Sequence, residues 1–262
     1  MLKILFTSPI YFIRRCCTKL NFYLLTLSYL KFKKNHIFNI NIDDLNFKMS
    51  FADYKLSGSI VERIQGIREP ETTSIIRSTV KEGAKILEIG GCYGYFTTIM
   101  SKCTRENGEV VSLEGLPNNY KILIENIKLN SLNNVKCYNY FISSTEKFIY
   151  FNRKAKDPYK DIKNMQNNKM DDKQEKVECI KLNEFLKQIN FEPTHIFMDI
   201  EGFEVDALEH LFNSDFLNNK PQIVFEIHKR FYKNENVYPE LVKKLSEKGY
   251  KIREIAGNCL AY

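Results

Sequence analysis

Two short apolar runs in the second half of the chain each end in a pair of polar residues that could do chemistry. Asp199 and Glu201 lie at the end of the first run, and Glu226 and His228 at the end of the second. One residue separates the members of each pair, so both members point to the same side of an extended strand. If the two strands are parallel neighbours, all four side chains meet at one edge of a sheet.

Such a cluster could serve two chemistries. Asp199, Glu201, Glu226 and His228 could together hold a divalent cation such as Mg²⁺ or Mn²⁺, largely through carboxylate oxygens. Alternatively, His228 could act as a general base that the carboxylates orient. The sequence favours His228 as the base with Asp199 and Glu201 as its catalytic partners, and it leaves the metal open.

A glycine-rich turn forms a second candidate site. Lys85–Ile89 is short, apolar and bounded by turn residues, as expected of a buried parallel strand. Gly90 and Gly94 open the segment that follows, and a ligand there would meet bare backbone. Glu114 ends a second predicted strand, Glu109–Leu113, where a carboxylate can accept both ribose hydroxyls of a nucleoside.

The spacing of this turn discriminates between cofactors. A dinucleotide site needs Gly-x-Gly-x-x-Gly with the pyrophosphate on a helix N-terminus, whereas this chain has Glu88-x-Gly90-x-x-x-Gly94. An acid beside the ligand favours a cationic cofactor without phosphate. S-adenosylmethionine has both properties, because it carries a sulfonium and an ammonium and no phosphate. The plain alternative is a tight strand-to-helix turn without a ligand. The residues expected to contact the cofactor are Glu88, Gly90, Tyr93, Gly94, Glu114 and Asp199.

Several motifs are shared with one family: Arg68-Glu-Pro70, Leu87-Glu-Ile-Gly-Gly-Cys-Tyr-Gly-Tyr-Phe96, Leu113-Glu114, residues 126–130, Met198-Asp-Ile-Glu-Gly-Phe-Glu204 and Phe225-Glu-Ile-His228. With them, residues 59–255 resemble the FkbM family of class I methyltransferases. The most specific part is Asp-Ile-Glu-Gly-x-Glu followed by Glu-x-His. One departure is Leu182-Asn-Glu184, where the family usually has Leu-Asp; Asn183 keeps the helix-capping chemistry.

The resemblance implies the fold and the reaction. It implies an α/β, Rossmann-like fold with a mostly parallel seven-stranded sheet and helices on both faces. It also implies methyl transfer from S-adenosylmethionine to a hydroxyl, as on a sugar of a glycan or glycolipid, with Glu69 near the amino acid end of the cofactor. The alternatives are a methyltransferase of protein or nucleic acid and a non-catalytic cofactor-binding scaffold.

The charge and the cysteine content limit which partners, metals and compartments are expected for this protein. The chain has 262 residues, 39 basic and 32 acidic, and seven of the basic ones precede Asp43 without any acid among them. The rest is formally neutral, which is not the footprint of a nucleic-acid-binding domain. The seven cysteines form no Cys-x-x-Cys pair, which argues against zinc and for a reducing cytoplasm.

The basic residues before Asp43 alternate with large apolar ones, which suggests an N-terminal extension, residues 1–58, ahead of a methyltransferase domain, residues 59–262. Its longest uncharged stretch, residues 20–30, is about half of the roughly 20 residues that span a bilayer. Two interpretations stay open for residues 1–34. They are a helical element that packs on the domain or on a second copy in a homo-oligomer, or an amphipathic helix at the inner face of an anionic membrane.

The remaining elements follow from periodicity and turn signals. Strands are expected at residues 135–142, 194–200, 222–227, 251–255 and 259–262, and helices at 59–66, 71–80, 95–101, 120–129, 182–189, 204–212 and 238–248. Residues 153–176 are polar and read as a surface insertion, either a lid or a plain loop. His195 begins its strand at the opposite edge and His210 falls in a helix, so neither is a good catalytic candidate.

Overall fold

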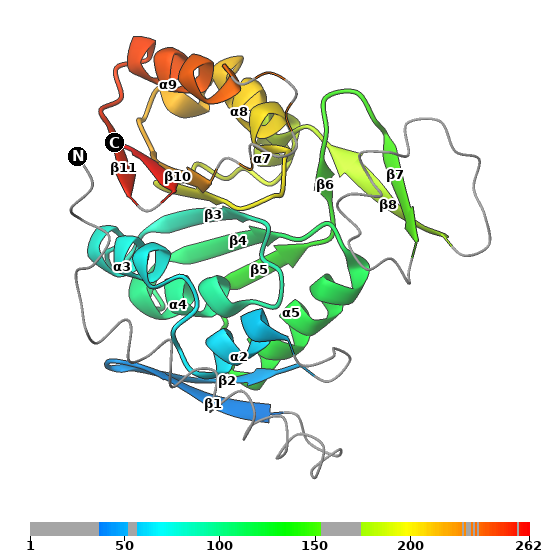
Figure 1. Cartoon of the computed structure of the whole chain (residues 1–262), viewed down its shortest axis with the longest axis vertical. Helices are drawn as coiled ribbons and strands as arrows, with labels where there is room; N and C mark the ends of the chain where they lie inside the picture. Colours follow the sequence, from blue (N-terminus) through cyan, green and yellow to red (C-terminus); the bar gives the residue numbers. More distant parts are fainter. Residues whose placement is uncertain are drawn as a thin grey trace. The chain divides into compact units, whose positions relative to one another are not determined.

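The computed structural model describes residues 37–51, 57–152, 174–226, 228, 232, 234, 236–255 and 257–262 (Figure 1). The chain divides into two compact units, Met1–Pro70 and Glu71–Tyr262, and each is described by itself. The predicted helical tail, residues 1–34, lies outside the described residues. The predicted domain boundary at residue 58 lies before the division between the units.

The first unit contains a hairpin and a short helix. Strands β1 (Ile37–Ile42) and β2 (Leu45–Ser50) pair antiparallel, and helix α2 (Gly58–Ile64) follows. Alternate side chains of the hairpin are buried, as the period of a strand with one covered face requires. The side chain of Ser57 caps α2 by accepting a hydrogen bond from the backbone N–H of Ile60.

The second unit is built on a seven-stranded sheet. Its strands are β3 (Lys85–Ile89), β4 (Glu109–Leu113), β5 (Val135–Tyr138), β9 (His195–Met198), β10 (Gln222–Glu226), β11 (Ile252–Ile255) and β12 (Asn258–Ala261). The order across the sheet is β11-β12-β10-β9-β3-β4-β5. The pairs from β10 to β5 are parallel, and β12 is antiparallel to both of its neighbours. The prediction of a mostly parallel sheet with β3 beside β9 is confirmed.

Helices cover both faces of this sheet (Figure 1). Those on one face are α3 (Pro70–Thr79), α4 (Tyr95–Thr104) and α5 (Pro117–Leu129), and those on the other are α7 (Leu182–Gln188), α8 (Glu204–Phe212) and α9 (Val237–Glu247). A 3-10 turn, η1 (Asp215–Leu217), follows α8. Each strand-to-strand connection on the parallel side therefore passes through a helix, as in a doubly wound sheet.

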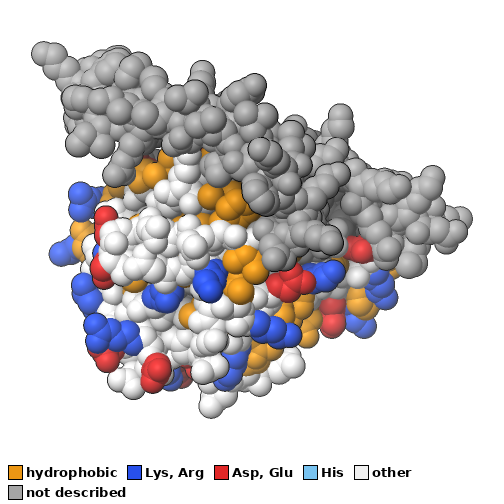
Figure 2. All heavy atoms as spheres, turned by 90° about the horizontal axis from the view of Figure 1, so that it is seen from below, with side chains coloured by type: hydrophobic (Ala, Val, Ile, Leu, Met, Phe, Trp, Pro, Cys, Tyr) orange, Lys and Arg blue, Asp and Glu red, His pale blue; other side chains and the backbone are white. Residues whose placement is uncertain are grey.

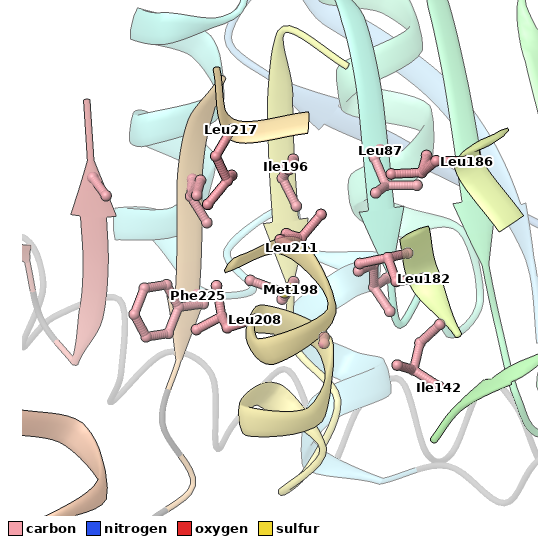
Figure 3. Packing of buried hydrophobic residues seen from close by; sticks show 14 of the residues in the cluster. Leu87, Ile142, Leu182, Leu186, Ile196, Met198, Leu208, Leu211, Leu217 and Phe225 are labelled. Carbon is pink, nitrogen blue, oxygen red and sulfur yellow. The ribbon is translucent and has the colours of Figure 1, made fainter. Parts of the chain in front are cut away.

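The main core lies between the sheet and the second set of helices. Leu87 of β3, Ile196 of β9 and Phe225 of β10 pack there against Leu208 and Leu211 of α8 (Figure 3). All five side chains are fully buried. Because neighbouring residues of a strand alternate between faces, Glu88 points to the opposite face, toward α4. This alternation therefore fixes the direction of the Glu88 side chain.

The prediction of one continuous strand over residues 135–142 is wrong. It divides into β5 and β6 (Phe141–Ile142), and β6 belongs to a separate three-stranded sheet with β7 (Phe148–Asn152) and β8 (Gln174–Ile180). The side-chain amide of Asn139 donates to the carbonyl oxygens of Glu114 and Gly115 at 2.7 and 3.0 Å. These bonds hold the chain in a bend where a straight strand was expected.

The structure corrects the C-terminal end of the predicted insertion, residues 153–176. Residues 153–173 lie outside the described residues, so the alternatives of lid and loop remain. Residues 174–176 open strand β8 instead of belonging to a loop. The N-cap position of α7 is taken by Lys181, and the N–H of Leu182 donates to Nδ1 of His210. Asn183 lies one residue inside the helix, where its Oδ1 still accepts from the first-turn N–H of Glu184 at 3.0 Å.

Charges of both signs are mixed on the described surface (Figure 2). On the face drawn in Figure 2, Lys and Arg side chains lie among Asp and Glu side chains, and the described residues there form no single basic stripe. Cys92, Cys103, Cys137, Cys179 and Cys259 are free thiols. No helix within the described ranges is long and apolar enough to cross a membrane.

Candidate active site

A cavity opens where strands β3, β4 and β9 end. The space there amounts to about 380 Å³ when the part that is open to solvent is included. Its walls include the glycine turn, two acids and an aromatic side, namely Gly90, Glu114, Asp199, Tyr140, Phe141 and Phe203. None of the described residues that line it is basic. The cavity is therefore apolar with a negative floor.

The glycine turn brings the chain close to the end of β9. Gly90 has a φ of +97°, and a Cβ at this position would lie 2.1 Å from the carbonyl oxygen of Asp199. Only glycine fits there without moving backbone. Gly94, with a φ of +84°, begins α4, and a Cβ there would lie 2.8 Å from the side chain of Leu123. Gly90 thus lines the cavity. Gly94 is absent from the cavity wall, and its predicted contact with the cofactor stays a prediction.

Glu114 is held by the backbone. Its Oε2 accepts from the N–H of Cys92 and its Oε1 from the N–H of Leu116, both at 2.7 Å. The residue is 3 % exposed. Burial raises the pKa of Glu114 to about 7, against the lowering effect of these hydrogen bonds. Because each carboxylate oxygen can accept more than one hydrogen bond, Glu114 can still receive donors from a ligand in the cavity.

Glu88 lies behind the turn. Its Oε2 accepts from the hydroxyls of Thr97 and Ser112, the latter at 2.6 Å, and burial raises the pKa of Glu88 to about 7. It is absent from the cavity wall, as is Tyr93, whose carbonyl oxygen accepts from the amide of Asn126 at 2.8 Å. The structure therefore gives both residues contacts that support the turn, and their predicted contact with the cofactor stays a prediction.

Asp199, Glu201, Glu226 and His228 form what we call the acid–histidine cluster. Nε2 of His228 lies 3.6 Å from Oδ1 of Asp199 and 3.5 Å from Oε2 of Glu201. Asp199 also lines the cavity and its side chain is 43 % exposed, whereas that of His228 is 10 % exposed. The parallel pairing of β9 with β10 brings the two motifs together as the alternation of polar residues predicts.

The cluster shifts the protonation of its members. Burial alone would lower the pKa of His228, but the hydrogen bond with Glu204 and the charges of Asp199 and Glu201 raise it to about 9. Although the side chain of Asp199 is 43 % exposed, the protein around its carboxylate desolvates it, and this raises the pKa of Asp199 to about 6 against the opposing charge of His228. At neutral pH the imidazole ring therefore carries both protons and Asp199 is largely ionised.

The same cluster has the geometry of a cation site. Asp199, Glu226 and His228 each offer one ligand atom, and these atoms lie within 4.8 Å of one another. Such separations suit one divalent ion with ligands at about 2.0–2.6 Å. The residues therefore fit the metal that the sequence leaves open, with Glu201 beside them on Nε2 of His228.

Two members of the network were missed in the sequence. Glu204 is fully buried, and its Oε1 lies 2.8 Å from Nδ1 of His228. Tyr232 donates its hydroxyl proton to Oε2 of Glu204 at 2.6 Å. Burial alone would raise the pKa of Glu204, but the bonds from His228, Tyr232 and Gly202 lower it. Glu204 ends the motif Met198-Asp-Ile-Glu-Gly-Phe-Glu204, but its contacts with His228 and Tyr232 appear only in the fold.

The other candidates lie apart from the cavity or outside this unit. Glu69 belongs to the first unit, where it pairs with Arg68, and its predicted contact with the cofactor stays a prediction. Nε2 of His195 lies 3.3 Å from the carbonyl oxygen of Thr79, and Nε2 of His210 lies 2.9 Å from the hydroxyl of Ser144. Neither ring reaches the cavity, in line with their exclusion above.

The fold and the site define a class of enzyme. Counted along the chain from β3, the strands across the sheet from β5 are the third, second, first, fourth, fifth, seventh and sixth. This order, with the seventh strand antiparallel, the glycine turn after the first and an acid after the second, is that of class I methyltransferases. The Methyltransferase FkbM domain matches residues 88–252. The chain belongs to the FkbM methyltransferase family.

Solved structures of other proteins are similar to about three quarters of this chain. The O-methyltransferase from Bacillus cereus, solved in complex with SAH, is 16% identical with a TM-score of 0.47, covering 74% of this chain and 80% of that one. Fibrillarin from Aeropyrum pernix, solved with natively bound S-adenosyl-L-methionine, is 14% identical with a TM-score of 0.46, covering 73% of each chain. Among curated proteins, none matches this chain.

Proposed function

We propose that the chain transfers a methyl group from S-adenosylmethionine to a hydroxyl of a sugar in a glycan or glycolipid. The observation that carries the cofactor is the cavity floor, where Glu114 and Asp199 lie without a basic neighbour in the wall. Negative charge there attracts the sulfonium and ammonium of S-adenosylmethionine and repels a pyrophosphate. Glu114 would accept the ribose hydroxyls, and Gly90 lets the cofactor approach the backbone.

The cofactor would supply a methyl group that is already activated, so the residues have to place the acceptor and remove its proton. The acid–histidine cluster lies at the cavity through Asp199, where an acceptor hydroxyl would meet it. One mechanism uses Nε2 of His228 as the base, which requires that the ring first lose its Nε2 proton. The carboxylates would then stabilise the imidazolium that forms.

The second mechanism uses a divalent cation on Asp199, Glu226 and His228. A bound Mg²⁺ or Mn²⁺ would lower the pKa of an acceptor hydroxyl, and binding it would displace the Nε2 proton of His228. Glu201 would then balance the charge of the ion. The two mechanisms place different demands on the same residues, so they can be separated by experiment.

The acceptor class is tested with labelled cofactor. The full chain is incubated with methyl-labelled S-adenosylmethionine and a panel of free monosaccharides, lipid-linked glycans, RNA and protein. We expect label on a sugar, in a base-stable linkage typical of an ether. Label on RNA or protein instead would overturn the sugar assignment, and no label with any acceptor would favour the non-catalytic scaffold.

The metal is tested in the same assay. If a cation activates the hydroxyl, a chelator removes the activity and Mg²⁺ or Mn²⁺ restores it. If His228 is the base, the chelated enzyme keeps its rate. Replacement of Glu226 by Gln separates the two further, because Glu226 belongs to the metal triad, whereas the base mechanism uses Asp199 and Glu201 as the partners of His228.

A second proposal concerns residues 1–34, where seven cations alternate with apolar residues and no acid occurs. We propose that this segment holds the enzyme at the inner, anionic face of a membrane, where each basic residue contributes about 1 kcal/mol. Liposomes that contain anionic lipid should sediment the full chain, less so at high salt. Equal partitioning of a chain that lacks residues 1–34 would favour packing on the domain or in a homo-oligomer.

A further inference from the structure

Glu204 lies outside the cavity but against the acid–histidine cluster. Its side chain is 0% exposed, and a buried carboxylate is costly unless it is fully hydrogen-bonded. Three donors meet this requirement: Nδ1 of His228 at 2.8 Å and the N–H of Gly202 at 3.0 Å on Oε1, and the hydroxyl of Tyr232 at 2.6 Å on Oε2. All three come from outside α8 (Glu204–Phe212).

The direction of these bonds follows from their partners. A backbone N–H only donates, so Oε1 of Glu204 acts as an acceptor toward Gly202. The hydroxyl oxygen of Tyr232 lies 3.5 Å from the N–H of Val205, which leaves its proton for Glu204. Three donors favour the ionised form of a carboxylate, and an ionised Glu204 can only accept, so the proton of the bond to His228 lies on Nδ1 of the ring.

We propose that Glu204 is the positioning residue of the acid–histidine cluster, fixing the His228 ring with Nδ1 protonated and Nε2 directed at Asp199 and Glu201. The distances of 3.6 and 3.5 Å from Nε2 to these two acids follow from that orientation. The effect of this ring orientation on catalysis rests on the proposed function. The orientation itself rests only on the hydrogen bonds of His228 and Glu204.

Glu204 is suited to this role because its own position is rigid. It is the first residue of α8, and the buried side chains of Ala207, Leu208 and Leu211 fix that helix on the sheet. His228, in contrast, follows the end of β10. A carboxylate on a packed helix can therefore define the orientation of the ring.

Both mechanisms of methyl transfer need this orientation. A general base must present an unprotonated nitrogen to the acceptor, and a metal ligand must present one to the ion. In each case that nitrogen is Nε2 and the bond at Nδ1 selects it. Loss of such a carboxylate partner typically costs about 10–100-fold in activity or metal affinity.

The first test is the spectrum of the ring and needs neither cofactor nor acceptor. In ¹⁵N-labelled full-length protein, Nδ1–H of His228 should appear as a slowly exchanging ring signal, assigned by its loss in His228→Ala. Glu204→Met removes the acceptor and should abolish the signal. Glu204→Gln keeps an acceptor oxygen and should retain it. A wild-type protein without this protected proton overturns the proposal, whether or not Glu204→Met folds.

The second test is kinetic, with labelled S-adenosylmethionine and the sugar panel. Glu204→Met should lower kcat by about 10–100-fold with little change in the KM of the cofactor, and Glu204→Gln should restore most of the rate. Glu209→Met is the control on the same helix, at a half-buried acid that pairs with Lys244 away from the acid–histidine cluster. In a His228→Ala background the Glu204→Met change should cost nothing more. An equal loss in both backgrounds would show that Glu204 acts only through stability and would overturn its positioning role.

Discussion

Glu114 and His228 lie at the same edge of the sheet, but the protein holds them in different ways. Backbone N–H groups of Cys92 and Leu116 fix Glu114. Other side chains, those of Glu204, Asp199 and Glu201, surround His228. A backbone donor survives any substitution except proline, whereas a side-chain partner does not. We therefore expect the Glu114 side of the site to tolerate changes in its neighbours and the His228 side to be sensitive to them.

The largest effect is expected on the sensitive side. His228→Ala should lower the rate of methyl transfer by about 10²–10⁴-fold if the ring is the base, while calorimetry shows unchanged affinity for S-adenosylmethionine. His195→Gln, at the opposite edge of the same sheet, is the control and should keep its activity. If His228→Ala also retains the full rate, the cluster is not catalytic.

The next effect is on stability and concerns Glu88, the buried acid behind the glycine turn. Its pKa in the folded protein is raised from 4.5 to about 7, so the folded state binds the proton more tightly than the unfolded state. This contribution is complete below the unfolded pKa and is lost as the pH rises through about 7. The loss amounts to about 3 kcal/mol.

Urea denaturation at about pH 5 and about pH 8 measures this loss. Wild-type protein should be less stable at the higher pH, with Glu114 contributing in the same direction because burial also raises its pKa to about 7. Glu88→Gln cannot ionise and should lose clearly less stability over this range. Equal losses in both proteins would mean that Glu88 is already ionised at low pH.

The smallest effect is expected for a neighbour of Glu114, on the side of the site that should tolerate substitution. Asn119 is buried and its side chain is the third hydrogen-bond partner of Glu114. Because the two backbone donors remain, Asn119→Ala should weaken the binding of S-adenosylmethionine by only about 0.5–1.5 kcal/mol. A loss as large as that in Glu114→Ala would show that the backbone bonds alone do not hold the carboxylate.

Much of this fold could be predicted because its central strands are short, apolar and buried on both faces. The bounds of β3, β4 and α8 agree with those expected from the sequence. The glycine spacing indicated the turn, and the alternation of Asp199 with Glu201 indicated that they share an edge with His228. These features are local, so a single sequence contains them.

What escaped prediction depends on contacts between distant parts of the chain. The bend at Asn139 arises from bonds to Glu114 and Gly115, and strand β8 begins with polar residues that resemble the insertion before them. Glu204 meets His228 and Tyr232 only after α8 has packed on the sheet, 24 and 28 residues along the chain. No spacing rule in the sequence indicates such a meeting.

The central claim is that the cavity beside Glu114 binds S-adenosylmethionine, and isothermal calorimetry on three purified proteins tests it most directly. The wild type should bind the cofactor, and Glu114→Ala should bind it more weakly by roughly 1.5–3 kcal/mol because the ribose hydroxyls lose a charged acceptor. Glu109→Ala changes the acid at the start of the same strand, which pairs with Lys136 at 2.7 Å, and should bind like the wild type. Equal affinity of all three proteins, or no binding by the wild type, would contradict the account.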